Sequence, residues 1–165
     1  MNIKKKLVLF CDLDGTLIRT VSGKTFPEDV SDFRLRLDVL DKIRKMRPHK
    51  VFIVTNQGGI PEYVKQADFE AKLRCIEHFV SSYVGCGTAT EYCASADKAH
   101  PDRKPNPGML NKLWPVYCDD YLKSQMLMIG DASGKPGDFS DSDRKCAENF
   151  GIDYLDVEDF VNGNY

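Results

Sequence analysis

Short apolar runs alternate with longer segments of helical periodicity, and this alternation restricts the possible folds more than any other feature of the sequence. The apolar runs lie at residues 6–12, 50–56, 88–94, 125–131 and 152–157. Runs such as KVFIVTN are continuous rather than alternating, as expected for strands that are buried on both faces. We therefore predict an α/β fold with three layers, in which helices cover both faces of a parallel five-stranded sheet.

Four segments between and after these strands have helical character. Segment 66–85 is the clearest, because its apolar residues recur at helical spacing and a glycine closes it. The second half of 32–48, segment 105–117 and segment 140–151 complete the predicted helices. Since no repeat, linker or low-complexity stretch interrupts this order, we expect residues 1–165 to form a single domain.

Composition excludes several classes of protein. The apolar runs are only about five or six residues long, whereas a membrane-spanning helix needs roughly 18. The basic, apolar start lacks the small-residue cleavage site of a signal peptide, and the six cysteines contain no C-x-x-C pair. A net charge of -2 gives no general attraction to nucleic acid. We expect a cytoplasmic protein with reduced thiols and no membrane segment.

Polar side chains follow three of the predicted strands at the point where each strand ends. Asp12 and Asp14 follow the first strand, Thr55 and Asn56 end the second, and Asp131 follows the fourth. The carboxyl ends of parallel strands form the edge where ligands bind in open sheets. Two carboxylates one residue apart also repel each other unless a cation or a proton lies nearby. The sequence therefore predicts a ligand site at this edge.

Four short motifs occur in a fixed order: D-L-D-G-T at residues 12–16, V-T-N at 54–56, R-K-P at 103–105 and I-G-D at 129–131. This ordered set resembles the haloacid dehalogenase (HAD) superfamily of phosphotransferases, and the resemblance covers the whole chain. It implies a Rossmann-like fold without a large cap domain. It also implies a Mg²⁺-dependent phosphomonoesterase that forms an aspartyl-phosphate intermediate.

The resemblance implies a role for each motif residue. Asp12 would be the nucleophile, and Asp12, Asp131 and the backbone carbonyl of Asp14 would hold Mg²⁺. The Asp14 side chain would act as general acid and then as general base. Thr55 would bind the transferring phosphoryl group, while Lys104 would neutralise both the nucleophile and the phosphate.

Three further residues of the same motifs are expected to contact the substrate, namely Gly15, Thr16 and Asn56. Gly15 lets the chain turn sharply after the two aspartates, which leaves backbone amides free to face a phosphate.

The superfamily often has a second acid shortly after its Gly-Asp motif, and here two residues compete for that position. Asp138 and Asp143 both follow Asp131, with an insertion between. Asp143 fits better, and it would then position Lys104 or a metal-bound water. Capping of the following helix by Asp141 or Asp143 remains an alternative.

A narrower resemblance, to the polynucleotide 3'-phosphatases, concerns the substrate. It rests on the segments T-x-S-G-K-x-F-P, S-D-F-R, T-N-Q-G-G-I, R-K-P-N-P-G-M and G-D-A-S-G-K-P-G-D-F-S-D-S-D-R. By this resemblance Ser22 and Lys24 would contact the nucleotide beside the scissile phosphate. Glu62 stands where the family commonly has basic residues, which disfavours binding of a long polynucleotide and favours a nucleoside or short-oligonucleotide 3'-phosphate as substrate. The choice between DNA and RNA stays open, and a role in DNA repair would follow.

Two other functions remain alternatives. A phosphatase of the histidinol-phosphate or heptose-bisphosphate type would act on a phosphorylated small molecule. Its zinc-bearing members have three cysteines and a histidine before the Arg-Lys-Pro, whereas this chain has only Cys93 and His100 there. Two ligands do not make a tetrahedral site, so we predict no zinc. A catalytically silent module that binds phosphorylated ends is the second alternative, although the intact motif residues disfavour it.

Overall fold

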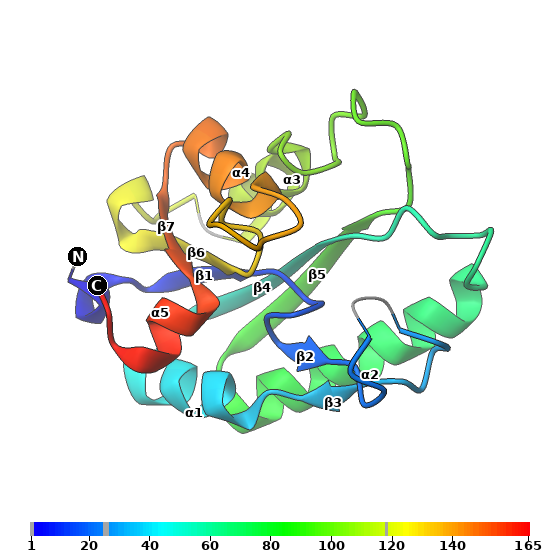
Figure 1. Ribbon diagram of the computed structural model, residues 1–165. Coiled ribbons are helices and arrows are strands. Elements are labelled where there is room, and N and C mark those ends of the chain that lie inside the picture. Colours follow the sequence, from blue (N-terminus) through cyan, green and yellow to red (C-terminus); the bar gives the residue numbers. More distant parts are fainter. Residues whose placement is uncertain (1, 25–26, 118) are drawn as a thin grey trace.

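The computed structural model describes residues 2–24, 27–117 and 119–165. Its centre is a five-stranded sheet with the order β5-β4-β1-β6-β7, and all adjacent strands are parallel (Figure 1). The strands are β1 (Val8–Cys11), β4 (Lys50–Asn56), β5 (Gly87–Cys93), β6 (Met126–Gly130) and β7 (Asp153–Asp156). The five predicted apolar runs are these five strands, so the predicted sheet is confirmed.

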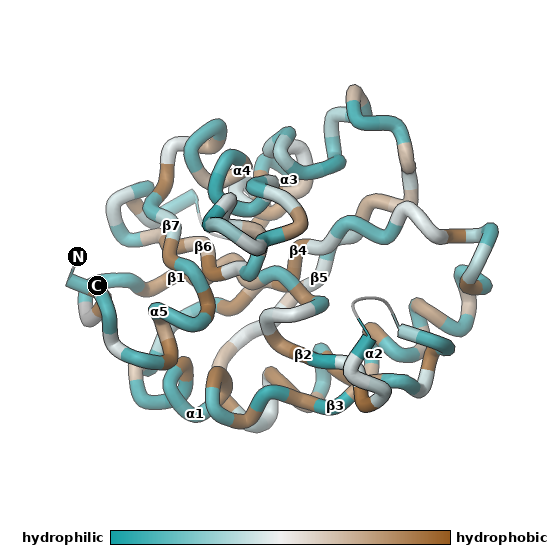
Figure 2. The backbone as a smooth tube through the Cα atoms, viewed as in Figure 1, coloured by the Kyte–Doolittle hydropathy of each residue, from teal (hydrophilic) through white to brown (hydrophobic). Residues whose placement is uncertain are grey.

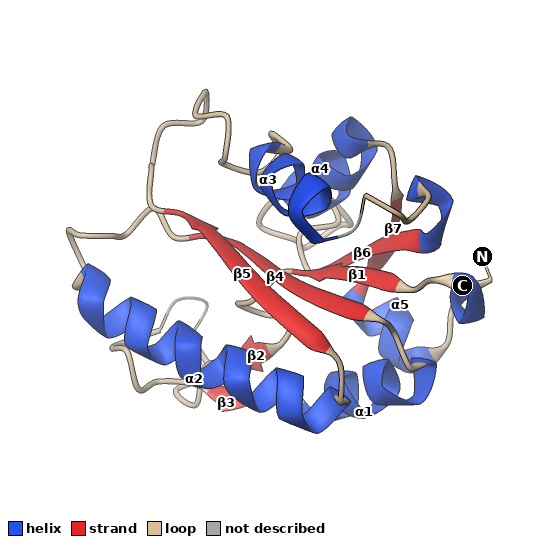
Figure 3. Cartoon of the chain, turned by 180° about the vertical axis from the view of Figure 1, so that it is seen from behind, coloured by secondary structure: helices blue, strands red, loops and turns tan. Residues whose placement is uncertain are grey.

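Helices cover both faces of the sheet, as the sequence predicts (Figures 1 and 3). One face carries α1 (Leu37–Met46), α2 (Gln66–Val84) and α5 (Val157–Asn162), and the other carries α3 (Gly108–Tyr117) and α4 (Ser142–Phe150). Two short 3₁₀ helices, η1 (Ile3–Lys5) and η2 (Lys123–Gln125), precede β1 and β6. None of the helices in the described ranges is both long and apolar enough to span a membrane.

Strand β1 shows why continuous apolar runs are needed here. Val8 and Phe10 pack with α3 and α4, while Leu9 and Cys11 pack with α1, α2 and α5. Successive side chains of a strand point to opposite faces, so a strand covered on both sides must be apolar at every position. Figure 2 shows this as hydrophobic segments along the central strands, with hydrophilic residues gathered in the surface loops.

The structure contains two features that the sequence patterns did not predict. Strands β2 (Ile18–Arg19) and β3 (Arg34–Leu35) form a separate antiparallel pair, and α5 follows β7. We call the described residues 18–24 and 27–35 the flap. It lies beside α2 in both Figure 1 and Figure 3. Strands of two residues are too short to show any hydrophobic period, so pattern analysis could not detect them.

The cysteines within the described ranges are free thiols: Cys11, Cys75, Cys86, Cys93 and Cys146. Cys118 lies outside the described residues.

Candidate active site

Three acidic side chains meet at the carboxyl edge of the sheet. Asp12 follows β1, Asp131 follows β6 and Asp143 lies in the first turn of α4. One carboxylate oxygen from each of the three lies within 4.8 Å of the other two. Asp12 is 7% exposed and Asp143 only 1%. Burial raises the pKa of Asp12 well above its usual value, and burial together with Asp143 raises that of Asp131 to about 7. Three ionised carboxylates are therefore unfavourable here unless a cation joins them.

Lys104 is the only cation that contacts this group within the described parts of the chain. Its ammonium donates to Asp12 Oδ1 at 2.6 Å and to the carbonyl of Val54 at 2.9 Å, and it lies 2.7 Å from Asp143 Oδ1. Burial alone would lower the pKa of Lys104, but Asp12 and Asp143 outweigh burial and raise it above its usual value. Lys104 thus stays charged, yet one ammonium cannot neutralise three carboxylates.

Two glycines allow this close packing of acids. A Cβ atom on Gly15 would lie 2.0 Å from Asp131 Oδ2, and one on Gly130 would lie 2.2 Å from Asp143 Oδ2. Gly15 also has a φ of +82°, a conformation that disfavours side chains. Each acid therefore packs directly against the backbone that carries a neighbouring acid. The structural requirement for glycine at position 15 agrees with the sharp turn predicted there.

Residues at the end of β4 connect the site. Thr55 is 1% exposed, and its hydroxyl oxygen accepts a hydrogen bond of 2.9 Å from Gln57 Nε2. Gln57 Nε2 also donates to Asp14 Oδ2 at 2.6 Å. Asn56 forms a reciprocal pair with the backbone of Lys104, at 2.9 and 3.0 Å. The amide of Asn56 thus anchors the loop that carries Lys104, whereas the sequence predicted a substrate contact for it.

Gln57 is a site residue that the sequence reasoning missed. Gln57 belongs to the segment T-N-Q-G-G-I that carries the resemblance to the 3'-phosphatases, but its role becomes clear only from its bonds to Asp14 and Thr55. Thr16 is fully buried, with its hydroxyl 3.5 Å from Asp12 Oδ2. Asp14 is half-buried at the edge of the group.

The two candidates for the second acid lie in different surroundings. Asp143 joins Asp12 and Lys104, and its Oδ2 accepts a hydrogen bond of 3.1 Å from the amide of Ala132. Asp138 instead accepts bonds from the backbone amides of Ser133 and Lys135, at 3.1 and 3.0 Å, and so stabilises its own loop.

Helix capping is not the role of either acid considered for it. Asp141 occupies the N-cap position of α4 without a side-chain capping bond, and its carboxylate instead pairs with Lys145 at 2.7 Å. The carboxylate of Asp143 is directed at Lys104 and Ala132 rather than at the amides of its own helix.

The flap residues predicted to contact a nucleotide are held by other parts of the flap. The amide and hydroxyl of Ser22 donate to Asp32 at 2.8 and 2.6 Å, and the exposed Lys24 forms an ion pair with Glu28. Phe26, from the same motif, lies outside the described residues. The structure thus places Ser22 and Lys24 in an exposed turn, without a contact to the acids described above.

Comparison with known proteins identifies the family. The model of the polynucleotide kinase 3 phosphatase family matches residues 6–161. The chain belongs to this family. It is 34% identical over 164 residues to the bifunctional polynucleotide phosphatase/kinase of Schizosaccharomyces pombe, covering 97% of this chain but 38% of that protein. It is 25% identical over 177 residues to the polynucleotide 3'-phosphatase ZDP of Arabidopsis thaliana, covering 97% of this chain and 24% of that protein.

A relative of similar length and two solved structures complete the comparison. A 20.8 kDa protein of Autographa californica nuclear polyhedrosis virus is 28% identical over 167 residues, covering 96% of this chain and 87% of that protein. A protein of Mesorhizobium loti described as a HAD-like phosphatase has a TM-score of 0.65 at 25% identity, covering 89% of this chain and 69% of that one. D,D-heptose 1,7-bisphosphate phosphatase from B. bronchiseptica, complexed with magnesium and phosphate, has a TM-score of 0.63 at 18% identity, covering 95% of this chain and 97% of that one. These matches confirm the HAD fold and the predicted relation to the 3'-phosphatases.

Proposed function

We propose that residues 1–165 act as one phosphatase domain that removes the 3'-phosphate from polynucleotide ends in a Mg²⁺-dependent reaction. One observation carries the proposal: a buried lysine lies 2.6 Å from Asp12, inside a group of three acids at the carboxyl edge of the sheet. Acidic side chains without a specific role normally lie in solvent, so the burial of these acids points to a function. Membership in the polynucleotide kinase 3 phosphatase family supports the choice of substrate.

The acid group fits Mg²⁺. Carboxylate oxygens are the ligands this ion prefers. The pKa values of Asp12 and Asp131 are raised, as expected for buried, neighbouring carboxylates whose negative charge is not fully neutralised by a cation. Asp12, Asp131 and the backbone carbonyl of Asp14 would hold the ion, which when bound supplies the positive charge that lets a carboxylate approach a phosphate. We still expect that the protein binds no zinc. Cys93 Sγ and His100 Nδ1 lie 3.6 Å apart, and two such ligands do not complete a tetrahedral site.

In the first step an oxygen of Asp12 forms a bond to phosphorus, and the bond from phosphorus to the ester oxygen breaks. Asp14 gives its proton to that oxygen, which leaves as the 3'-hydroxyl. Gln57 donates to Oδ2 of Asp14, so Oδ1 is available for the proton. The hydroxyl of Thr55 accepts from Gln57 and can therefore donate its own hydrogen to a phosphoryl oxygen.

In the second step Asp14 takes a proton from a water molecule, whose oxygen attacks phosphorus. The bond between Asp12 and phosphorus breaks and inorganic phosphate leaves. Lys104 neutralises the Asp12 carboxylate before the attack and the negative charge of the phosphoryl group once it is bound to Asp12, and Asp143 holds the ammonium in place at 2.7 Å.

The function is tested by comparing substrates in the presence of Mg²⁺. We expect kcat/KM for a 3'-phosphorylated oligonucleotide to exceed that for its 5'-phosphorylated isomer, histidinol phosphate and a heptose bisphosphate by about a hundredfold. This factor corresponds to roughly 2.7 kcal/mol of transition-state binding. A preference for either metabolite would refute the proposed substrate. The Asp12→Asn variant should fold normally and lose turnover, and normal turnover would refute the covalent mechanism.

A further inference from the structure

Lys72 differs from the other buried basic side chains of the described structure. It lies on α2 and is 9% exposed, and its ammonium forms no ion pair or hydrogen bond with any residue of the described ranges. The three other buried basic residues are each paired with carboxylates: Lys6 with Asp153, Arg36 with Asp38 and Glu158, and Lys104 with Asp12 and Asp143. Burying an unpaired charge is costly, so a lysine kept in this state needs an explanation.

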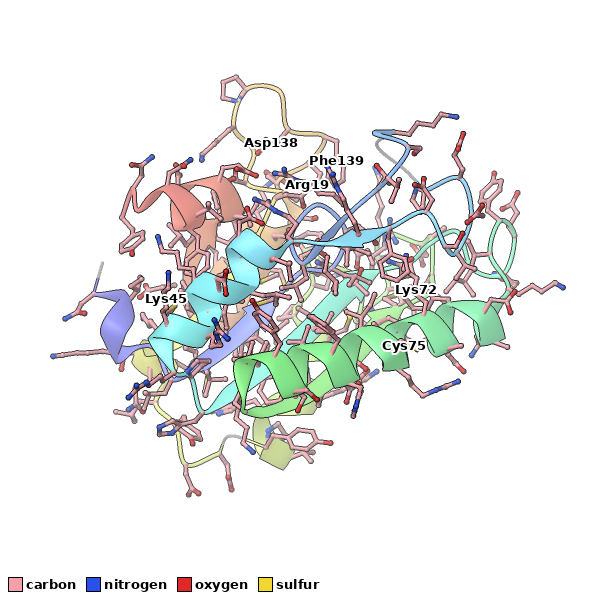
Figure 4. All side chains as sticks on the ribbon, turned by 90° about the horizontal axis from the view of Figure 1, so that it is seen from below. Arg19, Lys45, Lys72, Cys75, Asp138 and Phe139 are labelled. Carbon is pink, nitrogen blue, oxygen red and sulfur yellow. The ribbon has the colours of Figure 1, made fainter. Side chains whose placement is uncertain are left out.

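The surroundings of Lys72 place it against the flap and within range of the charge of Asp14. Its ammonium lies 4.8 Å from the ring centroid of Phe33, a flap residue, and Figure 4 shows the side chain between α2 and the flap. The carboxylates whose charges act on it are those of Asp14 and Asp32. Burial lowers the pKa of Lys72, and these two acids only partly oppose that effect.

Neither of these acids serves as an ion-pair partner. Asp32 accepts hydrogen bonds from the amides of Val21, Ser22 and Glu28 and from the Ser22 hydroxyl. Asp14 accepts from Gln57, and in the proposed reaction it faces the leaving oxygen.

Lys72 is buried but not completely enclosed. The fully buried side-chain nitrogen and oxygen atoms that lack a partner in the described structure are Thr88 Oγ1 and Trp114 Nε1. The Lys72 nitrogen is not one of them, and the residue as a whole keeps 9% of its surface exposed. Lys72 therefore offers a positive charge with no ion-pair partner in the described structure, packed against Phe33 of the flap and within range of the charge of Asp14.

We propose that Lys72 binds the phosphodiester that immediately precedes the 3'-terminal nucleotide of the substrate. This inference rests on the proposed function. The leaving group of that reaction is a nucleoside with its 3'-oxygen at Asp14, and the next anion along the leaving strand is this phosphodiester. Lys24, the other lysine predicted to contact the nucleotide, is already paired with Glu28 on the surface.

The proposal separates substrates that carry this diester from those that do not. A nucleoside 3'-phosphate has no second anion for Lys72, whereas a dinucleotide 3'-phosphate has one. A dinucleotide with a methylphosphonate linkage keeps the shape of the diester without its charge. A bisphosphorylated metabolite also offers a second phosphate, so heptose bisphosphate is included as a separate arm.

The experiment measures kcat and KM for these four substrates with wild-type protein, Lys72→Met, Lys72→Arg and a control, Lys45→Met. Lys45 is an exposed lysine on α1 and, like Lys72, forms no ion pair in the described structure (Figure 4). We expect Lys72→Met to lower kcat/KM for the native dinucleotide by about 10- to 100-fold, mainly through KM. For the nucleoside 3'-phosphate and the methylphosphonate, Lys72→Met should change kcat/KM by less than about threefold. Lys45→Met should leave kcat/KM unchanged for all four substrates.

Two further results are expected. In the wild-type protein, replacing the native linkage by the methylphosphonate should lower kcat/KM by about the same factor as Lys72→Met lowers it for the native dinucleotide. Lys72→Met should lower kcat/KM for the methylphosphonate only a little further. Lys72→Arg should restore part of the loss, because it retains the charge. The slope of log kcat/KM against log salt should become shallower by about 0.7 in Lys72→Met, as expected for one lost contact to a single strand.

Several outcomes would overturn the inference. Equal losses on the nucleoside and dinucleotide substrates would show that Lys72 acts through Asp14 or through the fold. A wild-type protein that hydrolyses the methylphosphonate as well as the native linkage would exclude a charged contact, whatever the stability of the variants. A loss confined to heptose bisphosphate would assign Lys72 to a metabolite phosphate. If the wild-type protein hydrolyses neither the nucleoside nor the dinucleotide substrate, the proposed function itself fails.

Discussion

Replacement of Lys104 by methionine tests the central electrostatic argument. Among the described residues, Lys104 is the cation that contacts the buried Asp12 and Asp143. The change to methionine removes this charge and keeps an unbranched side chain of nearly the same length. Breaking a buried ion pair by removing one partner typically costs about 3–5 kcal/mol, because the remaining charge is left uncompensated. For a domain of this size we expect the Tm to fall by roughly 6–20 °C.

The loss of stability in Lys104→Met should depend on pH and on Mg²⁺. Lys104 opposes the rise in the pKa of Asp12, so without the lysine this carboxylate takes up a proton more readily. The variant should therefore be least stable, relative to wild type, near pH 8 in a chelator, where protonation no longer relieves the repulsion. The difference should shrink near pH 5, and Mg²⁺ should reduce it near pH 8 by supplying another cation.

Thermal unfolding followed by circular dichroism, near pH 5 and near pH 8 with chelator or Mg²⁺, measures these differences. Lys135→Met is a matched control, because Lys135 pairs with Asp156 and Asp159 while its side chain is 46% exposed. An exposed pair of this kind contributes about 1 kcal/mol or less. A loss in Lys104→Met that is the same at both pH values and in both conditions would refute the charge-crowding explanation.

Two further predictions follow from the site. Wild-type protein in chelator should lose stability as the pH rises through about 7, because the pKa of Asp131 is raised to about 7 in the folded state and its favourable protonated form is lost above that pH. Mg²⁺ should raise the Tm more near pH 8 than near pH 5, and a pH-independent gain would contradict this. Gln57→Leu should lower kcat by about tenfold with little change in Tm, because it removes the bonds that orient Asp14 and Thr55. Single-turnover kinetics with a 3'-phosphorylated oligonucleotide would measure the effect, and an unchanged kcat would exclude that role for Gln57.

The sheet and its two helical layers could be predicted from sequence because their signal is local. A strand such as β1 is apolar at every position since each face is covered by helices. The placement of Asp12, Asp14, Thr55 and Asp131 then follows from the rule that parallel strands present their carboxyl ends at one edge. Of the three acids that meet in the site, Asp12 and Asp131 are thus predictable from the order of the elements, whereas Asp143 is not.

Other parts of the site depend on contacts between distant segments, and no local pattern records them. The choice between Asp138 and Asp143 required the path of the loop after Asp131, which turns back on itself through bonds to Asp138. The importance of Lys72 depends on the absence of a partner. A helical lysine in sequence looks like an ordinary solvated charge, and only the flap packed over it shows that it is buried.

The positive charges near the site suggest how a chain with a net charge of -2 could act on a polyanion. Two buried lysines lie near the site: Lys104 pairs with Asp12, and Lys72 is within range of the charge of Asp14. Lys24 is instead paired with Glu28 at the surface. A few buried lysines attract a phosphate strongly only when it lies close to the site, because salt screens their attraction to phosphates farther along the strand. On the proposed function, such an arrangement favours recognition of a strand end over binding along a strand. Lengthening the substrate beyond a dinucleotide would then add little to kcat/KM.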